Sequence, residues 1–249
     1  LARDDRQFLW SPYYKIKLVP VLPGHALDSR MGFSLDVNED YHQNAMNLSD
    51  AAMRELSASQ DTASWQGWRI LYDTPYSYAD GRERVLVLGA GTGNDIAAAL
   101  RAGAQRVDAV EIDPAIAELG RRHPEKPYAD PRVTLHVDDA RSFLQRAAGP
   151  YDLVVFGLLD SHRLLSSMSS VRLDTYVYTV ECLRRVRSLL TEHGTVSLSF
   201  CITEKWIAHR ISRMMEQAFG RAPALGRGPD ETLLIFLAGP GVEARLEPT

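Results

Sequence analysis

Three glycines and one carboxylate are spaced so that they could bind a nucleoside. Gly89, Gly91 and Gly93 follow a short apolar run, and Glu111 ends the next apolar run, about 20 residues farther on. Glycine adopts positive φ at no steric cost and lets a ligand approach the backbone. A carboxylate at the second place can accept hydrogen bonds from both ribose hydroxyls. The pattern predicts that the chain binds an adenosine-containing cofactor.

The residues after the glycines favour a cofactor without a phosphate. A dinucleotide site has the spacing G-x-G-x-x-G, and the N-terminus of its helix faces a pyrophosphate. Here the spacing is G-x-G-x-G, followed by Asn94 and Asp95. The Asp95 carboxylate at the helix mouth would compete with a phosphate for the backbone N–H groups. We therefore expect S-adenosylmethionine or its decarboxylated form, and a glycine turn without a ligand is the alternative.

Alternating strand and helix patterns are expected to position these residues. Continuous apolar runs are typical of strands covered on both faces, and they occur at 85–90, 107–112, 133–137, 151–159, 195–202 and 232–238. Helical spacing occurs between them, at 95–102, 114–122, 140–147, 174–190 and 204–219. This order predicts an α/β fold with a doubly wound, mostly parallel Rossmann-like sheet. The ligand should lie at the carboxyl ends of the first strands.

The N-terminal part of the chain has a different pattern. Residues 14–21 alternate in polarity, a Pro-Gly break follows, and residues 31–37 form a second short strand pattern, which predicts a β-hairpin. A helix pattern begins at 43 and continues to 56. The predicted organisation is an N-terminal hairpin subdomain at 1–48, a Rossmann-like domain at 49–240 and a frayed tail at 241–249.

Composition restricts the function classes and the setting. A chain of 249 residues with 45% hydrophobic residues can form a complete α/β core. The net charge of −4 gives no support for nucleic acid as a partner. Cys182 and Cys201 lack C-x-x-C spacing, so we expect no metal site and a reducing, cytoplasmic setting. The chain has no apolar run of membrane-spanning length, so we expect that these residues do not themselves cross a membrane. The sequence begins with Leu1 rather than methionine, so we expect attachment to an upstream domain or membrane segment.

The order of several motifs resembles the spermidine synthase-like (polyamine aminopropyltransferase) family. S-P-Y-Y-K-I, an Asp40-Tyr41 pair, the glycine loop, V-E-I-D, H-V-D-D-A-R-S-F and Y-D-L-V-V occur in that order between residues 11 and 219. The resemblance implies the class I methyltransferase fold with an extra N-terminal β domain. It also implies transfer of an aminopropyl group from decarboxylated S-adenosylmethionine to a small amine acceptor, and it allows a homodimer.

The resemblance implies residue roles on the cofactor side. Glu111 corresponds to the ribose-binding carboxylate, and Asp139 with Ala140 corresponds to the pair beside the adenine. Asp138 is expected either to contact the cofactor or to cap the following helix. His42 corresponds to a polar residue near the cofactor. A packed histidine at a domain junction is an equal alternative for His42.

The transfer side departs from the family pattern. Family members carry D-x-x-D-P after the fourth strand, where the first aspartate helps to deprotonate the attacking amine and the second holds the substrate. In this chain Gly157 replaces the first aspartate, Ser161 replaces the proline, and Asp160 remains. Thr92 replaces the usual acidic residue of the glycine loop. These differences predict that strict spermidine synthase activity is absent or weak.

The candidates for the transfer chemistry are therefore Asp160, His162 and Tyr41. An amine nucleophile needs a proton acceptor nearby, and Asp160 and His162 follow the fourth strand, where the transferred group would lie. Tyr41 corresponds to a tyrosine that lines the amine site of the family. The alternatives are a turn cap for Asp160, a solvated loop residue for His162 and a packed ring for Tyr41.

Three function classes remain open from the sequence. The first is an aminopropyltransferase-like enzyme. The second is a methyltransferase that uses intact S-adenosylmethionine, which Thr92 and Gly157 favour. The third is a non-catalytic, nucleoside-binding regulatory module. Because one fold serves all three, the choice depends on the site.

Overall fold

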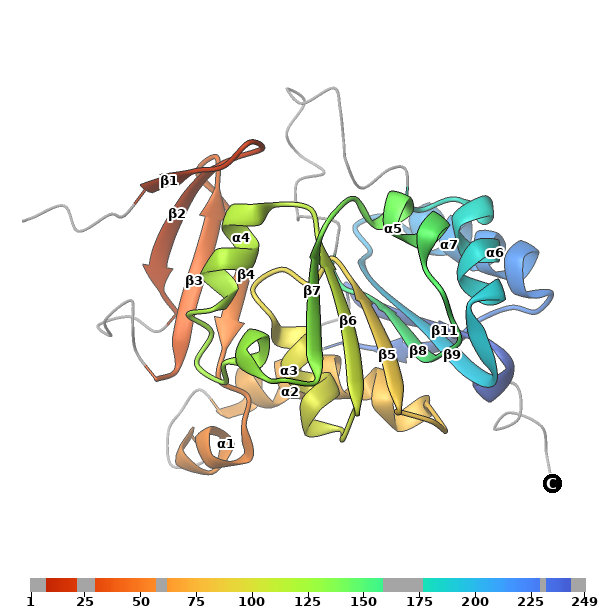
Figure 1. Cartoon of the computed structure of the whole chain (residues 1–249), viewed down its shortest axis with the longest axis horizontal. Helices are drawn as coiled ribbons and strands as arrows, with labels where there is room; N and C mark the ends of the chain where they lie inside the picture. Colours follow the sequence, from red (N-terminus) through yellow and green to blue (C-terminus); the bar gives the residue numbers. More distant parts are fainter. Residues whose placement is uncertain (1–7, 22–29, 57–61, 159–176, 229–231, 243–249) are drawn as a thin grey trace, which may run out of the picture.

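The structure is a computed structural model that describes residues 8–21, 30–56, 62–158, 177–228 and 232–242. These residues form a four-stranded N-terminal sheet beside a seven-stranded sheet with helices on its two faces (Figure 1). The predicted α/β class with a mostly parallel main sheet is confirmed.

The main sheet has the strand order β10-β11-β9-β8-β5-β6-β7. Its members are β5 (Arg84–Leu88), β6 (Arg106–Glu111), β7 (Val133–Val137), β8 (Tyr151–Phe156), β9 (Leu190–Cys201), β10 (Ala224–Arg227) and β11 (Leu233–Ala238). Strands β5 to β9 pair in parallel, whereas β11 and β10 are antiparallel to their neighbours. Strand β10 was not predicted, because its four residues form no apolar run. The order reverses at β5, where doubly wound sheets bind their ligands.

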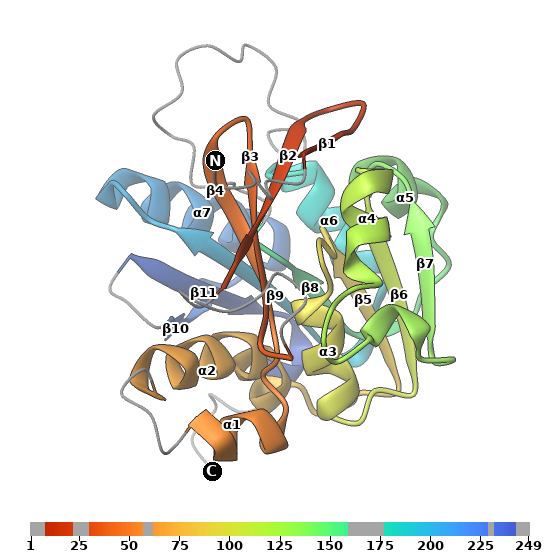
Figure 2. The same cartoon turned by 90° about the vertical axis from the view of Figure 1, so that its left-hand side faces the viewer.

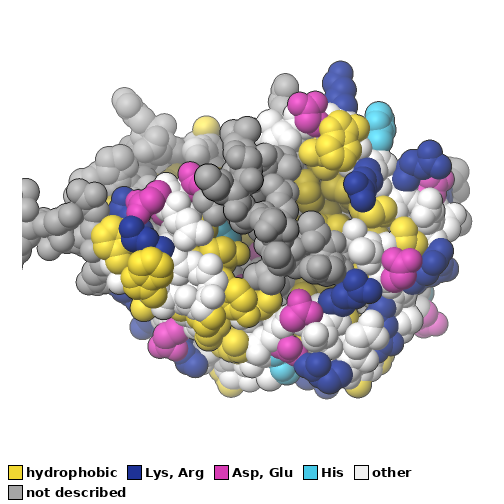
Figure 3. All heavy atoms as spheres, turned by 90° about the horizontal axis from the view of Figure 1, so that it is seen from above, with side chains coloured by type: hydrophobic (Ala, Val, Ile, Leu, Met, Phe, Trp, Pro, Cys, Tyr) yellow, Lys and Arg dark blue, Asp and Glu magenta, His cyan; other side chains and the backbone are white. Residues whose placement is uncertain are grey.

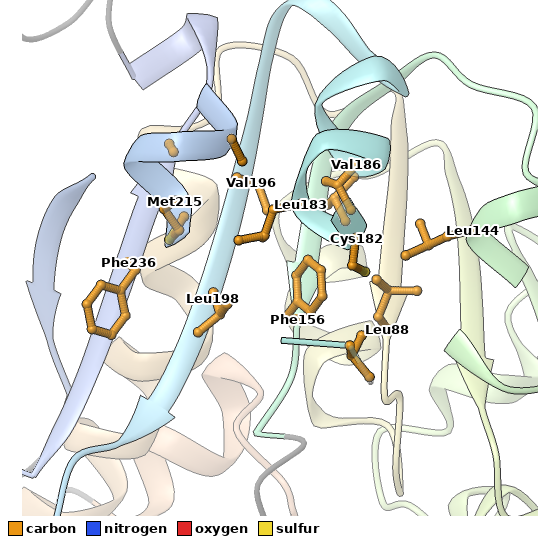
Figure 4. Close-up of a cluster of buried hydrophobic side chains, with 14 of the residues drawn as sticks. Leu88, Leu144, Phe156, Cys182, Leu183, Val186, Val196, Leu198, Met215 and Phe236 are labelled. Atoms are coloured by element: carbon orange, nitrogen blue, oxygen red, sulfur yellow. The ribbon is translucent and has the colours of Figure 1, made fainter. Parts of the chain in front are cut away.

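Helices cover the main sheet because alternate residues of its strands point to opposite faces. Leu86 and Leu88 of β5 pack in one buried cluster with α5 (Ala140–Arg146), α6 (Val180–Ser188) and α7 (Lys205–Phe219). Figure 4 shows this cluster, with Leu88 and Phe156 beneath Cys182 and Leu183. On the other face, Val85 and Val87 pack with α2 (Thr62–Tyr78) and α3 (Asn94–Arg101).

One helix begins later than its sequence pattern predicts. The pattern indicated helix from 174 to 190, but α6 begins at Val180. The Thr179 side chain caps it by accepting a hydrogen bond from the Cys182 amide at 3.2 Å. This cap fixes the start of α6, since Thr179 has an extended backbone conformation.

The N-terminal sheet is antiparallel and contains β1 (Phe8–Trp10), β2 (Lys15–Pro20), β3 (Gly32–Val37) and β4 (Asp40–Met46). The predicted hairpin corresponds to β2 and β3. The helix predicted from 43 was wrong for residues 43–49, of which 43–46 belong to β4; helix α1 runs over Asp50–Leu56. Pairing with β3 buries Ala45 and Met46, and this tertiary contact outweighs the local helical pattern.

Helix α4 (Pro114–Gly120) joins the two sheets. Its Ile116 and Leu119 share a buried cluster with Phe33 and Leu35 of β3. The N-terminal sheet therefore lies beside α4, as Figures 1 and 2 both show. Asp113 caps α4 by accepting from the Ala115 amide at 2.8 Å. The N-terminal sheet is thus fixed next to the end of β6.

The surface of the N-terminal sheet is partly apolar. Seen from above, hydrophobic side chains gather among charged ones at the end of the molecule that carries this sheet (Figure 3). Phe8, Leu9 and Trp10 of β1 are all exposed, and the Lys15 ammonium lies 4.4 Å from the centre of the Phe8 ring. None of the helices in the described ranges has the length and hydropathy needed to cross a membrane.

At the other end of the chain, Val242 is 2% exposed and packs with Leu71 and Leu237. It falls within the range predicted to be a frayed tail. The rest of that predicted tail, residues 243–249, lies outside the described residues.

Candidate functional site

The glycine loop turns tightly between β5 and α3. Gly89, Gly91 and Gly93 have φ values of 70°, 56° and 110°. A Cβ atom on Gly93 would lie 2.7 Å from Pro127 Cγ and 3.1 Å from the Tyr128 ring, so this position has no room for a side chain. The Tyr128 hydroxyl donates to the Gly91 carbonyl at 2.7 Å. The loop is therefore held in one conformation by packing from outside.

Glu111 holds the same loop through a hydrogen bond. Its carboxylate accepts hydrogen bonds from the Gly91 amide at 2.8 Å and from the Asp113 amide at 2.9 Å. Burial raises the pKa of Glu111, while these two amides act in the opposite direction. A carboxylate has about four lone-pair positions, so Glu111 keeps capacity to accept ribose hydroxyls. The glycine loop is thus hydrogen-bonded to Glu111, the residue that is predicted to bind the ribose.

The predicted adenine pair lies next to Glu111. The amide of Asp138 donates to the Glu111 carbonyl at 3.0 Å, which brings the end of β7 against the end of β6. The N-cap of α5 is Asp139, whose carboxylate accepts from the Ser142 amide at 2.8 Å. The capping role considered for Asp138 was therefore wrong; Asp138 instead pairs with Arg146. Asp139 retains a second carboxylate oxygen beside the buried Ala140.

Strand β4 reaches the glycine loop from the N-terminal sheet. The Gln43 side-chain carbonyl accepts from the Thr92 amide at 3.0 Å and from the Thr92 hydroxyl at 3.1 Å. A Cβ atom on Gly91 would lie 2.4 Å from the same oxygen. Sequence reasoning missed Gln43, because the predicted helix placed it outside the site. Its position directly after the Tyr41-His42 pair was the available signal.

Asn94 makes a second connection between β4 and the main sheet. Its side-chain amide donates to the Asn44 carbonyl at 2.6 Å and to the Tyr72 hydroxyl at 3.0 Å. Its side-chain oxygen accepts from the Met46 amide at 3.0 Å. Asn94 is 5% exposed, and these bonds satisfy its polar atoms. Strand β4, helix α2 and helix α3 therefore meet at this one side chain.

Asp95 lies in the first turn of α3, where β5 and β8 end. Burial raises the pKa of the Asp95 carboxyl to about 7. Its negative charge in turn raises the pKa of Tyr72, Tyr76 and Tyr128, whose burial acts in the same direction. The carboxyl group thus lies within electrostatic range of three tyrosines, and the Tyr76 hydroxyl donates to the Asp95 backbone carbonyl at 3.2 Å.

Gly157 lies directly against Asp95. Its amide donates to the Leu88 carbonyl at 3.0 Å, which continues the pairing of β8 with β5. A Cβ atom on Gly157 would lie 2.8 Å from the Gly89 carbonyl oxygen and 3.1 Å from Asp95 Oδ2. A side chain at residue 157 would therefore require the backbone to shift. Asp160 and His162 follow in the chain but lie outside the described residues, so their roles stay predictions.

Tyr41 lies in the region of Tyr72, whereas the His42 ring lies near that of Tyr14. Burial raises the pKa of Tyr72, and Asp95 and Tyr41 act on it in the same direction, so the three side chains lie in the same region. Burial and the nearby Asp36 raise the pKa of Tyr41 to about 12. His42 is the extra residue at an irregularity of the β3–β4 ladder, and its ring lies 6.0 Å from that of Tyr14.

Comparisons with known proteins agree with this architecture. Residues 85–171 match the model of a methyltransferase domain. The chain is 32% identical over 116 residues to the polyamine aminopropyltransferase of Korarchaeum cryptofilum, which covers 45% of this chain and 33% of that protein. It is 32% identical over 120 residues to polyamine aminopropyltransferase 2 of Bacillus cereus, and this match covers 45% of this chain and 30% of that protein. These matches span about a third of the length of the curated relatives.

Solved structures of spermidine synthases share the fold. One, in complex with the transition-state analogue AdoDATO, superposes with a TM-score of 0.65 at 14% identity and covers 94% of this chain and 74% of that one. The chain shares the fold of the spermidine synthases. The spermidine synthase of Thermotoga maritima gives a TM-score of 0.62 at 14% identity and covers 94% and 73%. The resemblance inferred from the sequence is thereby confirmed, together with the class I methyltransferase fold.

At this edge of the sheet, the side chains that the structure describes form no group of metal ligands. Within the described ranges, no three His, Cys, Asp or Glu side chains are grouped as metal ligands would be. The polar groups that converge there are instead suited to a nucleoside and a cation: Glu111 and Asp139 on one side, Asp95 and Tyr41 on the other.

Proposed function

We propose that this chain binds S-adenosylmethionine or its decarboxylated form and transfers an aminopropyl group to a small amine acceptor. The observation that carries the proposal is the Glu111 carboxylate, held by the Gly91 and Asp113 amides at the carboxyl end of β6. It can accept ribose hydroxyls, because a carboxylate has about four lone-pair positions and two of them are used by these amides. The names of the relatives support a transferase that acts on polyamines.

The residues that we propose to bind the cofactor follow one another along the carboxyl edge of the main sheet. Gly89, Gly91 and Gly93 would approach the nucleoside through their backbone, while Glu111 would hold the ribose. Asp139 and Ala140 would lie beside the adenine, because the end of β7 adjoins the end of β6. His42 and Asp95 would lie toward the rest of the cofactor. Such an edge suits a neutral nucleoside better than a pyrophosphate, since Asp95 adds negative charge at the mouth of α3.

The transfer itself requires an acceptor nitrogen without its extra proton. The bound sulfonium cofactor supplies an activated electrophilic carbon. Asp160 and His162 are the proposed groups for the proton, and Tyr41 is proposed to line the amine site. The chain can further contribute by holding the acceptor in place and excluding water, which lowers the barrier to a bimolecular step.

A methyltransferase is the second candidate, and two observations favour it. Gly157 has no room for the aspartate that the related enzymes carry there, since a Cβ atom would lie 2.8 Å from the Gly89 carbonyl oxygen. Thr92 is committed to Gln43 and supplies no charge for an aminopropyl ammonium. A nucleoside-binding module without catalysis is the third candidate. The predicted dimer, upstream attachment and cytoplasmic setting stay predictions.

The released nucleoside separates these candidates. The protein is incubated with S-adenosylmethionine or its decarboxylated form, each with a pool of polyamine and amino-acid acceptors, and the products are identified by mass spectrometry. Acceptor-dependent methylthioadenosine from the decarboxylated form is the expected result. S-adenosylhomocysteine would instead identify a methyltransferase, and tight nucleoside binding without a product would identify the regulatory module.

A further inference from the structure

The Asp95 carboxylate occupies a costly position for a charged group. It lies against Gly157 at the carboxyl ends of β5 and β8, and its charge acts on Tyr72, Tyr76 and Tyr128. Among the residues that the structure describes, the Asp95 amide itself is the hydrogen-bond donor that acts on this carboxylate, and Arg101 acts on it as a charge. Burial raises the pKa of Asp95 despite both, so the carboxylate has too little compensation for the hydration that it loses. A cationic ligand at this place would supply the partner.

A side chain at residue 157 would crowd the Asp95 carboxylate. A Cβ atom on Gly157 would lie 3.1 Å from Asp95 Oδ2. An aspartate at 157 would therefore bring a second carboxylate against the first, and two adjacent carboxylates oppose each other's ionisation. The site has room for one carboxylate, which here comes from α3 rather than from the end of β8.

We propose that the Asp95 carboxylate, rather than Asp160 or His162, contacts the acceptor nitrogen and accepts its proton, in place of the aspartate that Gly157 replaces. Asp95 would then lie where the cofactor and the acceptor meet. The inference rests on the proposed function, since it assigns a residue to that transfer. As the acceptor nitrogen forms its bond to the aminopropyl carbon, the bond from that carbon to sulfur breaks and the sulfonium becomes a neutral thioether. The proton that the nitrogen loses goes to the Asp95 carboxylate, so charge and atoms balance.

The surroundings of Asp95 suit a proton acceptor near neutral pH. A general base works best when its pKa lies near the working pH, and burial raises the pKa of Asp95 to about 7. The titratable and charged groups that face it are Tyr72 and Tyr76 from α2, Arg101 from its own helix, Tyr128 from the turn at Pro127–Ala129, and, through Tyr72, Tyr41 of β4. Burial keeps these tyrosines neutral, so Asp95 is the acidic member of the group at neutral pH.

The first test measures binding rather than turnover. Isothermal titration calorimetry with methylthioadenosine, which lacks the aminopropyl ammonium, reports on the nucleoside edge. Titration of 1,4-diaminobutane into the methylthioadenosine complex reports on the acceptor place. Asp95→Asn should leave methylthioadenosine affinity within about threefold and weaken diamine affinity at least tenfold, because a charge-assisted contact is lost. Asp50→Asn, which removes an exposed acid from the first turn of α1, is the matched control and should change neither.

The second test follows the proton. In the wild-type protein, kcat/KM for the diamine should fall as the pH is lowered, with an apparent pKa near that of Asp95. Asp95→Asn should remove this fall from the pH profile and lower kcat at least 100-fold. Unchanged diamine affinity in Asp95→Asn overturns the inference and leaves the proposed function intact. So does a variant that loses only decarboxylated cofactor, because Asp95 would then bind the cofactor. Wild type that fails to bind methylthioadenosine overturns the proposed function instead.

Discussion

The two sides of the candidate site are built in different ways. On the nucleoside side, the ends of β5, β6 and β7 meet through backbone contacts between neighbouring parallel strands, and Glu111 bonds to amides within its own βαβ unit. On the transfer side, β4, α2, α3 and the end of β8 meet through side chains, with Asn94 and Gln43 crossing between the two sheets. The first side is local in sequence, whereas the second depends on tertiary packing.

This difference explains where the chain follows its relatives and where it departs from them. A glycine loop and its acidic partner are fixed by the backbone that they satisfy, so their residue types are restricted. A carboxylate for the transfer can come from any element that reaches the same place. Here residue 157 has no side chain, and the Asp95 carboxylate of α3 lies against it. The two sides can therefore be tested separately.

The largest effect is expected at Glu111. Glu111→Ala leaves the amides of Gly91 and Asp113 without their acceptor and removes the proposed ribose contact, and each buried unsatisfied donor costs about 1–3 kcal/mol. We expect methylthioadenosine affinity to fall about 100-fold or more, measured by calorimetry. Glu118→Ala, on the exposed face of α4, is the control and should bind normally. Unchanged affinity in Glu111→Ala would show that the nucleoside binds elsewhere.

A glycine pair tests whether the loop is held by packing. Gly93→Ala must place its Cβ atom 2.7 Å from Pro127 Cγ at a φ of 110°, whereas Gly220→Ala has a φ of 85° with nothing within 4 Å. Both variants carry the cost of left-handed backbone, about 1–2 kcal/mol. Gly93→Ala carries a further cost of overpacking, about 1–3 kcal/mol. Urea denaturation gives the free energy of unfolding of both, and equal losses would contradict the packing argument.

The nucleoside side could be predicted from the sequence, and the transfer side only in part. The apolar runs marked β5, β6 and β7 to within about two residues, because strands buried on both faces leave a continuous pattern. The glycine spacing and Glu111 then followed from local geometry. Gln43 was missed because residues 43–46 have a helical pattern and become strand only by pairing with β3. Tyr72 belongs to no motif, because its place in the site depends on a hydrogen bond from Asn94, which is distant in sequence.

Asp95 gives a smaller, pH-dependent effect on stability. Its pKa rises from the usual 3.8 to about 7 on folding, so between these values the folded state binds more protons than the unfolded state. The free energy of unfolding must therefore fall as pH rises through this window. Asparagine does not ionise, so the stability of Asp95→Asn relative to wild type should increase by about 2 kcal/mol from pH 5 to pH 8.

The measurement is urea denaturation of both proteins at each pH, so that all other titrations cancel in the difference. Asp50→Asn serves again as the control, because its carboxylate is exposed in an ion pair with Arg69. A difference that is flat with pH would mean that Asp95 stays ionised in the folded protein. Together with lost diamine binding, a gain in stability would identify Asp95 as a group kept for function at the expense of the fold.

The smallest expected effect concerns the contact between the two sides. Gln43→Ala removes the acceptor for the Thr92 amide and hydroxyl, and a net hydrogen bond contributes about 1 kcal/mol. The Thr92 amide should then exchange with deuterium about fivefold faster, while the Gly91 amide, which Glu111 holds, stays protected. Gln105→Ala, whose side chain bonds only to the exposed Gly103 carbonyl, is the control. If both amides lost protection together, the N-terminal sheet would stabilise the nucleoside side as well, and the separation between the two sides would fail.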